Sequence, residues 1–501
     1  MNWKIILKSF TNNDMRKKIF AVVGMIVIFR ILAHIPIPIA NGETLQQILE
    51  TLFNSTQSSQ LLGFMDVLSG GALANFSIML VGLGPFINAS IIMQLLTRAI
   101  PKLEALNKEG EFGRKKINQY TRVLALPLAI IQSIGSIYLV RQTASSIGGL
   151  GDITANASFS QWVLMVSALA GGAMLLMWLG ELITEQNIGN GISLIITIGI
   201  VSQLPTTGIN LLNSVIQDEK KWTIFGKQLP IDEKAFWLSL LIISIIVITT
   251  ILVVKLNEAA RNLTVNYAKR VQGNRIYGGV TTILPVKLIT AGVIPIIFAV
   301  AFLSVPSFLG QIFSNSSSDR LKEIGTHLVQ LFQPPSPQTF ATGGWQPYVY
   351  PIVYFLLVFI FTFFYTSIAF NSKEIAENLQ QQGGFIEGVR SGNQTEKYLN
   401  KVMNRLTLFG AIALGLLAVM PIIAQAFLGA NISLGGTSLL ILVAVSLETL
   451  RMLESQALML TYDQYDQPDY LYKSSETLSK KQNRIKVISK LALPKGKKKT
   501  K

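Results

Sequence analysis

Long apolar segments divide the chain, and they constrain its fold more than any other feature. A helix needs about 20 mostly apolar residues to cross the hydrocarbon core of a bilayer. Ten segments are candidates: 19–38, 76–97, 120–140, 161–183, 190–206, 236–256, 286–309, 348–370, 405–427 and 436–451. Because half of the residues are hydrophobic and only 14% are charged, the sequence predicts an all-α polytopic membrane protein with ten transmembrane helices.

The placement of Lys and Arg predicts how these helices are oriented. Of the 43 basic residues, 35 lie in five segments, which are 1–18, 98–122, 255–287, 371–405 and 451–501. Loops rich in Lys and Arg stay on the cytosolic side of a membrane. We therefore expect both termini in the cytosol, and the net charge of +16 requires no nucleic-acid partner.

Ten helices form two sets of five, and the second set begins on the opposite face of the membrane. Related halves of this kind make an inverted repeat, which is common in transport proteins. We expect a cytosolic segment at 1–18, an N-terminal half at 19–215, a C-terminal half at 216–460 and a basic tail at 461–501. The tail has 11 Lys or Arg after residue 469 and a single acidic residue there, Glu476, which is typical of a disordered segment.

Few residues of the chain could perform chemistry. The sequence has no cysteine and only two histidines, His34 and His327, which excludes disulfides, thiolate nucleophiles and the usual zinc sites. It has neither a phosphate-binding G-x-x-x-x-G-K-[ST] loop nor an H-E-x-x-H motif. We expect no cofactor and no enzymatic activity. A membrane-embedded enzyme or an inverted-repeat secondary transporter of a small solute are the alternatives.

An ion-coupled transporter would need a compact polar site near the midplane. The polar residues inside the predicted spans are few: Arg30, Asn88, Gln132, Glu181 and Glu448. Both carboxylates fall toward the cytosolic ends of their helices, so this set is too thin to favour the transporter.

Two predicted spans are interrupted by glycine and proline. Residues 66–96, "DVLSGGALANFSIMLVGLGPFINASIIMQLL", contain Gly70-Gly71 and then Gly82-Leu83-Gly84-Pro85. Leu83, Ile87 and Ile91 follow at a spacing of four, and so do Ile192 and Ile196 after Gly189 and Gly191, so each set shares one helical face. Lipid cannot satisfy the backbone groups that such breaks expose, which predicts that these segments line a cavity.

Several motifs in order resemble the SecY family, the central subunit of the protein-conducting translocon of bacteria and chloroplasts. They include "FRILAHIPIP", "SGGALANFSI", "MWLGELITEQNIGNGISLI", "AGVIPIIF" and "FNSKEIAENLQQQGGFIEGVRSGNQTEKYL", and the resemblance runs from about residue 10 to 460. It implies a channel in the bacterial plasma membrane that passes unfolded, signal-bearing polypeptides and releases transmembrane segments sideways into lipid. The two halves would be hinged between the fifth and sixth helices.

The resemblance also implies the functional parts of the channel. The pore waist would be a ring of six aliphatic side chains: Leu83, Ile87, Ile192, Ile196, Ile297 and Ile441. Such a ring offers no fixed ligands to a passing chain and resists ions by dewetting. The plug, at about 65–75, would include Met65, Ser69, Gly70, Gly71, Ala72, Leu73 and Asn75. Each of its two glycines weakens a helix by about 1 kcal/mol relative to Ala, which favours easy displacement.

The remaining implied residues concern the gate and the partners. The lateral gate would lie between the second and seventh spans, with the third and eighth beside them, at Asn88, Ile91, Gln132, Ile289 and Pro295. Ile289 stands where many relatives have Asn. The loops at 257–285 and 371–404 would dock the ribosome and a SecA-type motor ATPase through Arg270, Arg275 and Arg390. SecE-like and SecG-like small membrane subunits and membrane lipids are further implied partners.

Overall fold

The computed structural model describes residues 13–37, 77–146, 158–215, 222–224, 227–229, 233–267, 270–272, 275–277, 279, 281–314, 318–335, 339–340, 344–428 and 436–465. The chain divides into a large unit, Val22–Thr449, and a small unit made of its two ends, Met1–Ala21 and Leu450–Lys501. The packing described below belongs to the large unit. Of the predicted tail, the part beyond residue 465 lies outside the described residues.

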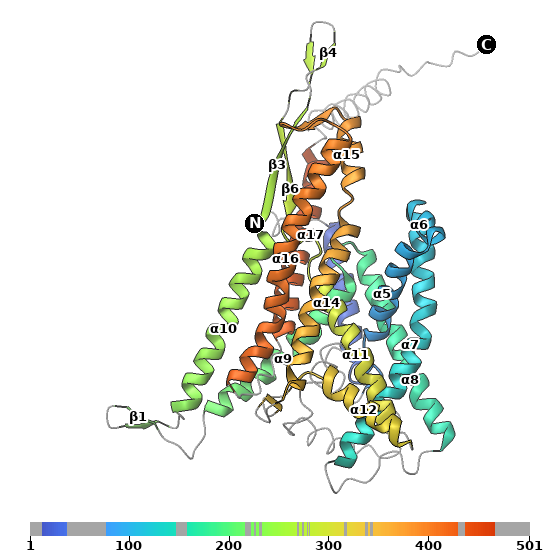
Figure 1. The fold of residues 1–501 in the computed structure, drawn as a ribbon, viewed down its shortest axis with the longest axis vertical. Helices are drawn as coiled ribbons and strands as arrows, with labels where there is room; N and C mark the ends of the chain where they lie inside the picture. Colours follow the sequence, from blue (N-terminus) through green and yellow to red (C-terminus); the bar gives the residue numbers. More distant parts are fainter. Residues whose placement is uncertain are drawn as a thin grey trace, which may run out of the picture. The chain divides into compact units, whose positions relative to one another are not determined.

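Helices dominate the described residues (Figure 1). Their bounds are α2 Asn13–Leu32, α5 Gly84–Ala99, α6 Pro101–Lys108, α7 Glu111–Ser146, α8 Phe159–Glu185, α9 Gly191–Val215, α10 Glu233–Glu258, α11 Ile294–Ser314, α12 Asp319–Phe332, α14 Gln346–Ala369, α15 Ser372–Gln381, α16 Asn393–Leu428 and α17 Gly436–Tyr465. The strands are β1 Trp222–Ile224, β2 Lys227–Leu229, β3 Ala260–Tyr267, β4 Arg270–Gln272, β5 Arg275–Tyr277, β6 Thr281–Lys287 and β7 Gly384–Ile386.

Six stretches of described helix are long and apolar enough to cross a membrane. They coincide with α7, α8, α10, α11, α14 and α16, the third, fourth and sixth to ninth predicted spans. The other four predicted spans fall on α2, α5, α9 and α17, which do not meet these criteria over the described residues. The chain is therefore mostly helical with several membrane-crossing helices, as a multi-pass membrane protein requires.

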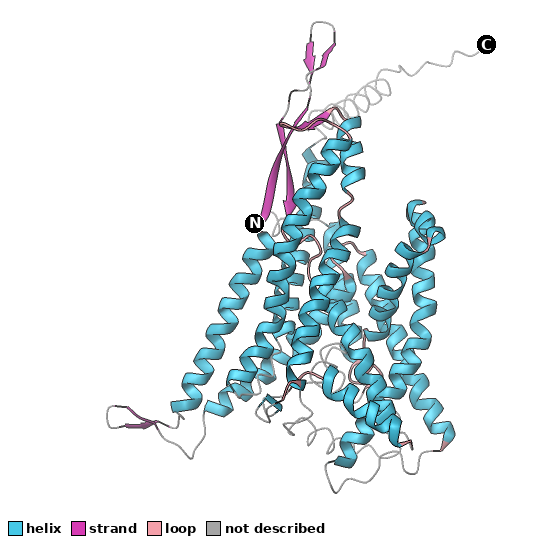
Figure 2. Cartoon of the chain, in the orientation of Figure 1, coloured by secondary structure: helices cyan, strands magenta, loops and turns pink. Residues whose placement is uncertain are grey.

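The chain is mostly helical, as the predicted all-α class requires, but it also contains short strands that were not predicted, most of them in the loop between α10 and α11 (Figure 2). β3 pairs along its length with β6, with Leu263 opposite Leu284, and its far end pairs with β7, where Val265 lies opposite Ile386. The seventh predicted span also began too early, since residues 281–287 form β6 and the helix starts at Ile294.

The three-stranded sheet brings two distant loops together. Its order is β6-β3-β7, so a strand from residues 384–386 completes a sheet begun at residue 260. The sheet packs on α15 and the start of α16 around one apolar core, whose buried members are Leu263, Val265, Val286, Ile386, Leu399 and Met403. The two basic loops, predicted as separate docking segments, thus share one folded core.

Among the described residues, the halves of the large unit contact each other at several places. α7 packs on α5 and α8, and α8 packs on α9, whereas α11, α14 and α16 pack in sequence in the C-terminal half. Between the halves, α9 contacts α10, and α11 contacts both α5 and α7. The second of these contacts joins the predicted second and third spans to the seventh.

Candidate functional site

The broken second span does not form one helix. Residues 78–83 form turns, and α5 begins only at Gly84 with Pro85 in its first turn, where a missing backbone N–H costs nothing. Gly82 has φ of +63°, a conformation that glycine adopts readily. The sequence prediction of a break at Gly82 to Pro85 is confirmed.

Protein, rather than lipid, satisfies the backbone of this break. Ser77 forms an antiparallel bridge with Pro36, and the N–H of Ile78 donates to the carbonyl of Ile35 at 3.1 Å. The N–H of Met79 is bonded to the hydroxyl of Ser77 at 3.0 Å. Since buried backbone groups need such partners, the end of the first span holds the irregular segment in place.

Close packing on α8 fixes the same segment. Gly172 lies so near the carbonyl O of Ile78 that a Cβ atom at this position would overlap it. Met79 and Leu83 are fully buried, and Ile87 and Ile91 of α5 are almost so. This non-helical stretch therefore lies in the interior of the protein.

The second break, between α8 and α9, is a turn capped by side chains. The side chain of Asn190 accepts hydrogen bonds from the N–H groups of Ile192 and Ser193, and the hydroxyl of Thr184 accepts one from the N–H of Gly191. A Cβ on Gly191 would overlap the carbonyl O of Gly180 in α8. Glycine permits this close approach of α8 and α9.

The six predicted ring residues come from four parts of the chain: the end of the 77–83 turn with α5, and then α9, α11 and α17. The side chains of Leu83, Ile87, Ile196, Ile297 and Ile441 are buried, and that of Ile192 is half-buried. Ile192 lies against Gly180, 3.3 Å from the position of a Cβ there. The assignment of these six to a pore waist stays a prediction.

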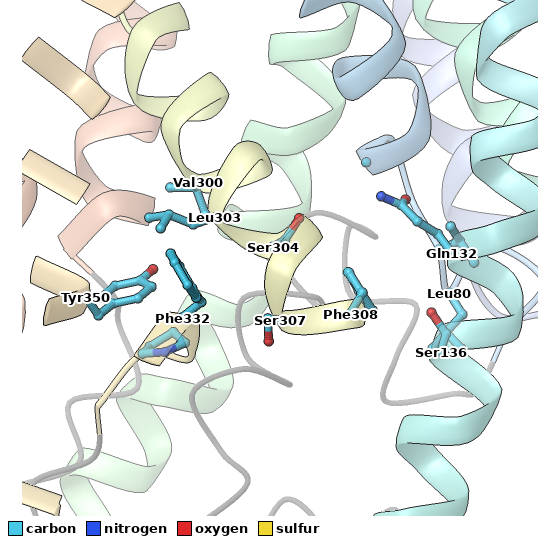
Figure 3. Close-up of a pocket in the computed structure, with 13 residues that line it drawn as sticks. Leu80, Gln132, Ser136, Val300, Leu303, Ser304, Ser307, Phe308, Phe332 and Tyr350 are labelled. Carbon is cyan, nitrogen blue, oxygen red and sulfur yellow. The ribbon is translucent and has the colours of Figure 1, made fainter. Parts of the chain in front are cut away.

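A pocket lies between the two halves, where α11 faces α7 (Figure 3). Its volume, as the space that can hold the centre of a water-sized sphere, is about 40 Å³. One side of the pocket is lined by α7 and by the turn that precedes α5. The other side is lined by α11, α12 and α14. Its lining residues are Leu80, Val81, Gly84, Gln132, Ser136, Val300, Leu303, Ser304, Ser307, Phe308, Phe332, Pro334 and Tyr350. Phe308 of α11 points toward the α7 side in Figure 3.

Two hydroxyls of this pocket were missed by sequence reasoning. Ser136 of α7 and Ser307 of α11 are only 1% and 2% exposed, and neither Oγ has a hydrogen-bond partner. Ser136 follows Gln132 by one turn, so its position on the same face could have been predicted. Ser307 carries no such signal, because nothing in the sequence of α11 says which face meets α7.

The predicted gate residues are not all brought together. Gln132 lines the pocket, whereas Asn88, Ile91, Ile289 and Pro295 are buried elsewhere. A Cβ on Gly410 of α16 would lie 3.7 Å from Cγ1 of Ile289, so this side chain faces the neighbouring helix of its own half.

Two polar contacts join membrane-spanning helices or their ends. At the end of α5, the guanidinium of Arg98 donates to the carbonyl of Ser367 in α14 at 3.3 Å, which links the halves next to the basic loops. Arg122 of α7 forms a salt bridge with Glu181 of α8, with Nη2 2.6 Å from Oε2 and Nε 2.9 Å from Oε1. The Glu181 carboxylate is therefore paired within the N-terminal half.

Two of the predicted docking arginines lie in a separate hairpin, and the third follows strand β7. Arg270 and Arg275 belong to the β4–β5 hairpin, in which Arg270 pairs with Tyr277 and Gln272 with Arg275. Arg390 is exposed in the turn between β7 and α16, and its carbonyl accepts a hydrogen bond from Thr395 at 2.9 Å. The predicted plug, 65–75, lies outside the described residues.

No group of His, Asp and Glu within the described residues could hold a metal ion.

Comparison with known proteins identifies a family. The SecY family profile matches residues 77–450. Among curated relatives, the protein translocase subunit SecY of Streptomyces coelicolor is 38% identical over 460 residues, covering 91% of this chain and 98% of the relative. That of Corynebacterium glutamicum is 38% identical over 466 residues, with the same coverage.

Solved structures share the fold. A structure of a protein-conducting channel superposes with a TM-score of 0.58 at 19% identity, covering 86% of this chain and 90% of that chain. Sec61 in the canine ribosome–channel complex from the endoplasmic reticulum superposes with a TM-score of 0.54 at 18% identity, with the same coverage.

Proposed function

This chain belongs to the SecY family, and we propose on that basis that it forms a protein-conducting channel and is not an enzyme. The channel passes unfolded, signal-bearing polypeptides across the membrane and releases apolar segments sideways into the bilayer. Relatives named as translocase subunits cover nearly the whole chain. The alternative of a small-solute transporter has no support from these relatives.

The irregular segment at 77–83 is the observation that carries this proposal. Non-helical backbone at membrane depth is tolerated only inside protein or beside a water-filled cavity. Here the backbone is held by Pro36 and Ile35, while Leu83 and Ile87 follow immediately with aliphatic side chains. With Ile192, Ile196, Ile297 and Ile441, they form the proposed waist, which excludes ions by dewetting and binds no particular side chain of a substrate.

The contact of α11 with α5 and α7 is the proposed lateral gate. The pocket lined by Gln132 lies at this contact. Beside it, Arg98 at the end of α5 donates a hydrogen bond to the carbonyl of Ser367 in α14. An opening here would lead from the waist to the lipid. The contact of α9 with α10 is the proposed hinge, and residues 65–75 are the proposed plug.

The folded core around β3 is the proposed docking surface. It presents Arg390, and the β4–β5 hairpin with Arg270 and Arg275 extends from the same loop. Arginine suits ribosomal RNA phosphates and acidic protein surfaces. A ribosome, a SecA-type motor, and SecE-like and SecG-like subunits are the proposed partners. Both termini would be cytosolic in a bacterial plasma membrane, as the Lys and Arg distribution favours.

Reconstitution tests the function directly. The purified complex is placed in vesicles with a SecA-type ATPase, ATP and a signal-bearing precursor, and the fraction of precursor protected from external protease is measured. We expect protection that requires ATP, and none for the same precursor without its signal. Absence of protection, with the complex intact and correctly oriented, would contradict a channel role.

A further inference from the structure

Helix α12, Asp319–Phe332, has one apolar and one polar face. The apolar side chains are Leu321, Ile324, Leu328, Val329, Leu331 and Phe332, which repeat at steps of three and four. Asp319, Arg320, Lys322, Glu323 and His327 lie outside this stripe. At 100° per residue the apolar positions span nearly half of the helix circumference, which is wider than a single packing contact needs.

One flank of the apolar stripe packs on α11. A Cβ on Gly310 of α11 would lie 2.9 Å from Cβ of Leu328 and 3.0 Å from the carbonyl O of Gly325. A Cβ on Gly325 would lie 2.6 Å from the carbonyl O of Gly310. The two backbones are thus pressed together, and α12 also contacts α14.

The other flank of the stripe is exposed at Ile324, whose side chain is 51% exposed. Leu321, one turn before Gly325 and near the start of the helix, is 39% exposed. Arg320 precedes Ile324 by one turn, and His327 follows it by three residues. The side chains of Arg320 and His327 are exposed, and they border the apolar edge at Ile324. An exposed apolar edge with a basic border is typical of helices that lie in the membrane interface.

The position of α12 along α11 fixes its depth. Gly310 precedes the end of α11 at Ser314 by four residues, about 6 Å at the rise of an α-helix. Earlier in α11, Phe302, Val305 and Leu309 are exposed at a spacing of three and four residues, as expected for a helix face in lipid. Since α12 touches the last turns of a membrane-crossing helix, it lies near the bilayer surface.

Aromatic residues mark the same level. Trp345 and Tyr348, at the start of the next membrane-crossing helix, α14, are 70% and 55% exposed. Exposed Trp and Tyr at the ends of membrane helices typically lie at the headgroup level. The chain therefore enters α14 at the interface, and residues 333–345 connect it to α12.

We propose that α12 is an interfacial helix that binds phospholipid. Leu321 and Ile324 insert among the acyl chains of the leaflet opposite the basic loops, and Arg320 contacts the phosphate of an anionic headgroup. This role goes beyond conduction. Because Phe332 and Pro334 line the pocket between α7 and α11, lipid would hold the segment that forms one wall of that pocket.

Fluorescence quenching tests the proposal. The chain has no cysteine, so Ile324→Cys and, as a control on the polar side, Thr326→Cys can each carry a single fluorophore. The intact complex is reconstituted in vesicles of phosphatidylethanolamine and phosphatidylglycerol. We expect brominated acyl chains to quench the probe at 324 several-fold more than that at 326, and aqueous iodide to show the reverse. Leu321→Cys serves as a second reporter if the first variant folds poorly.

Other outcomes would overturn the proposal. Equal quenching by iodide at 324 and 326 would place the flank in water. Protection of 324 from both quenchers would mean that protein covers it, and cross-linking from the same cysteine would then distinguish a second copy from a partner subunit. The variant Arg320→Glu tests the contact with anionic lipid. Phosphatidylglycerol is replaced by phosphatidylcholine, and the loss of bromine quenching is compared between this variant and the parent. An equal loss in both would mean that Arg320 does not bind the headgroup.

Discussion

Gly135 of α7 and Phe308 of α11 touch across the contact between the two halves, and a Cβ on Gly135 would lie 3.3 Å from Cδ1 of the Phe308 ring. The absence of a side chain at 135 lets the ring of Phe308 approach α7 beside the pocket. The approach of α7 to α11 therefore depends on a glycine.

Gly135→Leu is expected to loosen the proposed lateral gate. The added side chain must displace Phe308, and overpacking of this kind costs about 1 to 3 kcal/mol, which disfavours the closed arrangement. We expect increased export of precursors with defective signals, measured by protease protection in vesicles. Gly24→Leu is the control, because a Cβ there meets nothing within 4 Å. Equal export by the two variants would count against the gate.

Gly172→Ala is expected to destabilise the protein by about 1 to 3 kcal/mol or more. The new methyl overlaps the carbonyl O of Ile78, so the 77–83 segment or α8 must shift. Thermal unfolding of the purified complex, followed by intrinsic fluorescence, measures the loss. The neighbouring Gly171→Ala, with open space around it, should be nearly neutral. Similar midpoints for both would show that the segment adapts freely.

Ile87→Asn is expected to make the idle channel leak ions. A polar side chain at the proposed waist holds water where an aliphatic ring would dewet. Conductance of the purified complex in planar bilayers measures the leak, and Ile87→Leu, which keeps an apolar side chain of the same size, should retain the seal. An Asn variant as tight as the Leu variant would remove Ile87 from the waist.

Leu399→Ala is expected to weaken the shared core of the two basic loops. Leu399 is fully buried there, and truncating a buried Leu costs about 2 to 5 kcal/mol. Hydrogen exchange should accelerate at the amides of β3 and β7, while the amides of α7 and α8 stay protected. Leu408→Ala on α16, where the side chain is 49% exposed, is the control. Unchanged exchange in β7 would contradict a common core.

Arg390→Glu is expected to reduce motor-driven export several-fold without affecting membrane insertion of the channel. Reversing an exposed charge weakens attraction to an acidic partner and changes stability little. ATP-dependent protection of precursor and direct binding of the motor ATPase are both measured. Lys373→Glu makes the same change of charge at another exposed position of this region. If both variants export like the parent, Arg390 is outside the docking surface.

Much of the fold could be predicted from apolar length alone. α8, α10, α14 and α16 fall where about 20 apolar residues require them. The sheet could not be predicted in this way, because Val265 finds its partner Ile386 more than a hundred residues later. Alternating side chains in a short polar loop do not reveal so distant a partner.

The candidate site was predictable only in part. The glycines and proline at Gly82 to Pro85 predicted a break in the second span, and the structure has a break there. The order of motifs, rather than periodicity, pointed to the ring, since aliphatic residues four apart also face lipid or neighbouring helices. Ser307 and Phe308 were missed because the facing of α11 toward α7 is set by packing between the halves.

The order of strands has a consequence for motion. β3, β6 and β7 all come from the chain after α10, and among the described residues no backbone-to-backbone hydrogen bond joins α5 or α7 to α11 or α14. Parting these helices would break side-chain contacts and the Arg98 bond, while every ladder and helix stays intact. The contact of α5 and α7 with α11 and α14 can therefore open and close repeatedly without unfolding of secondary structure. The apolar area that each opening exposes to water sets its free-energy cost.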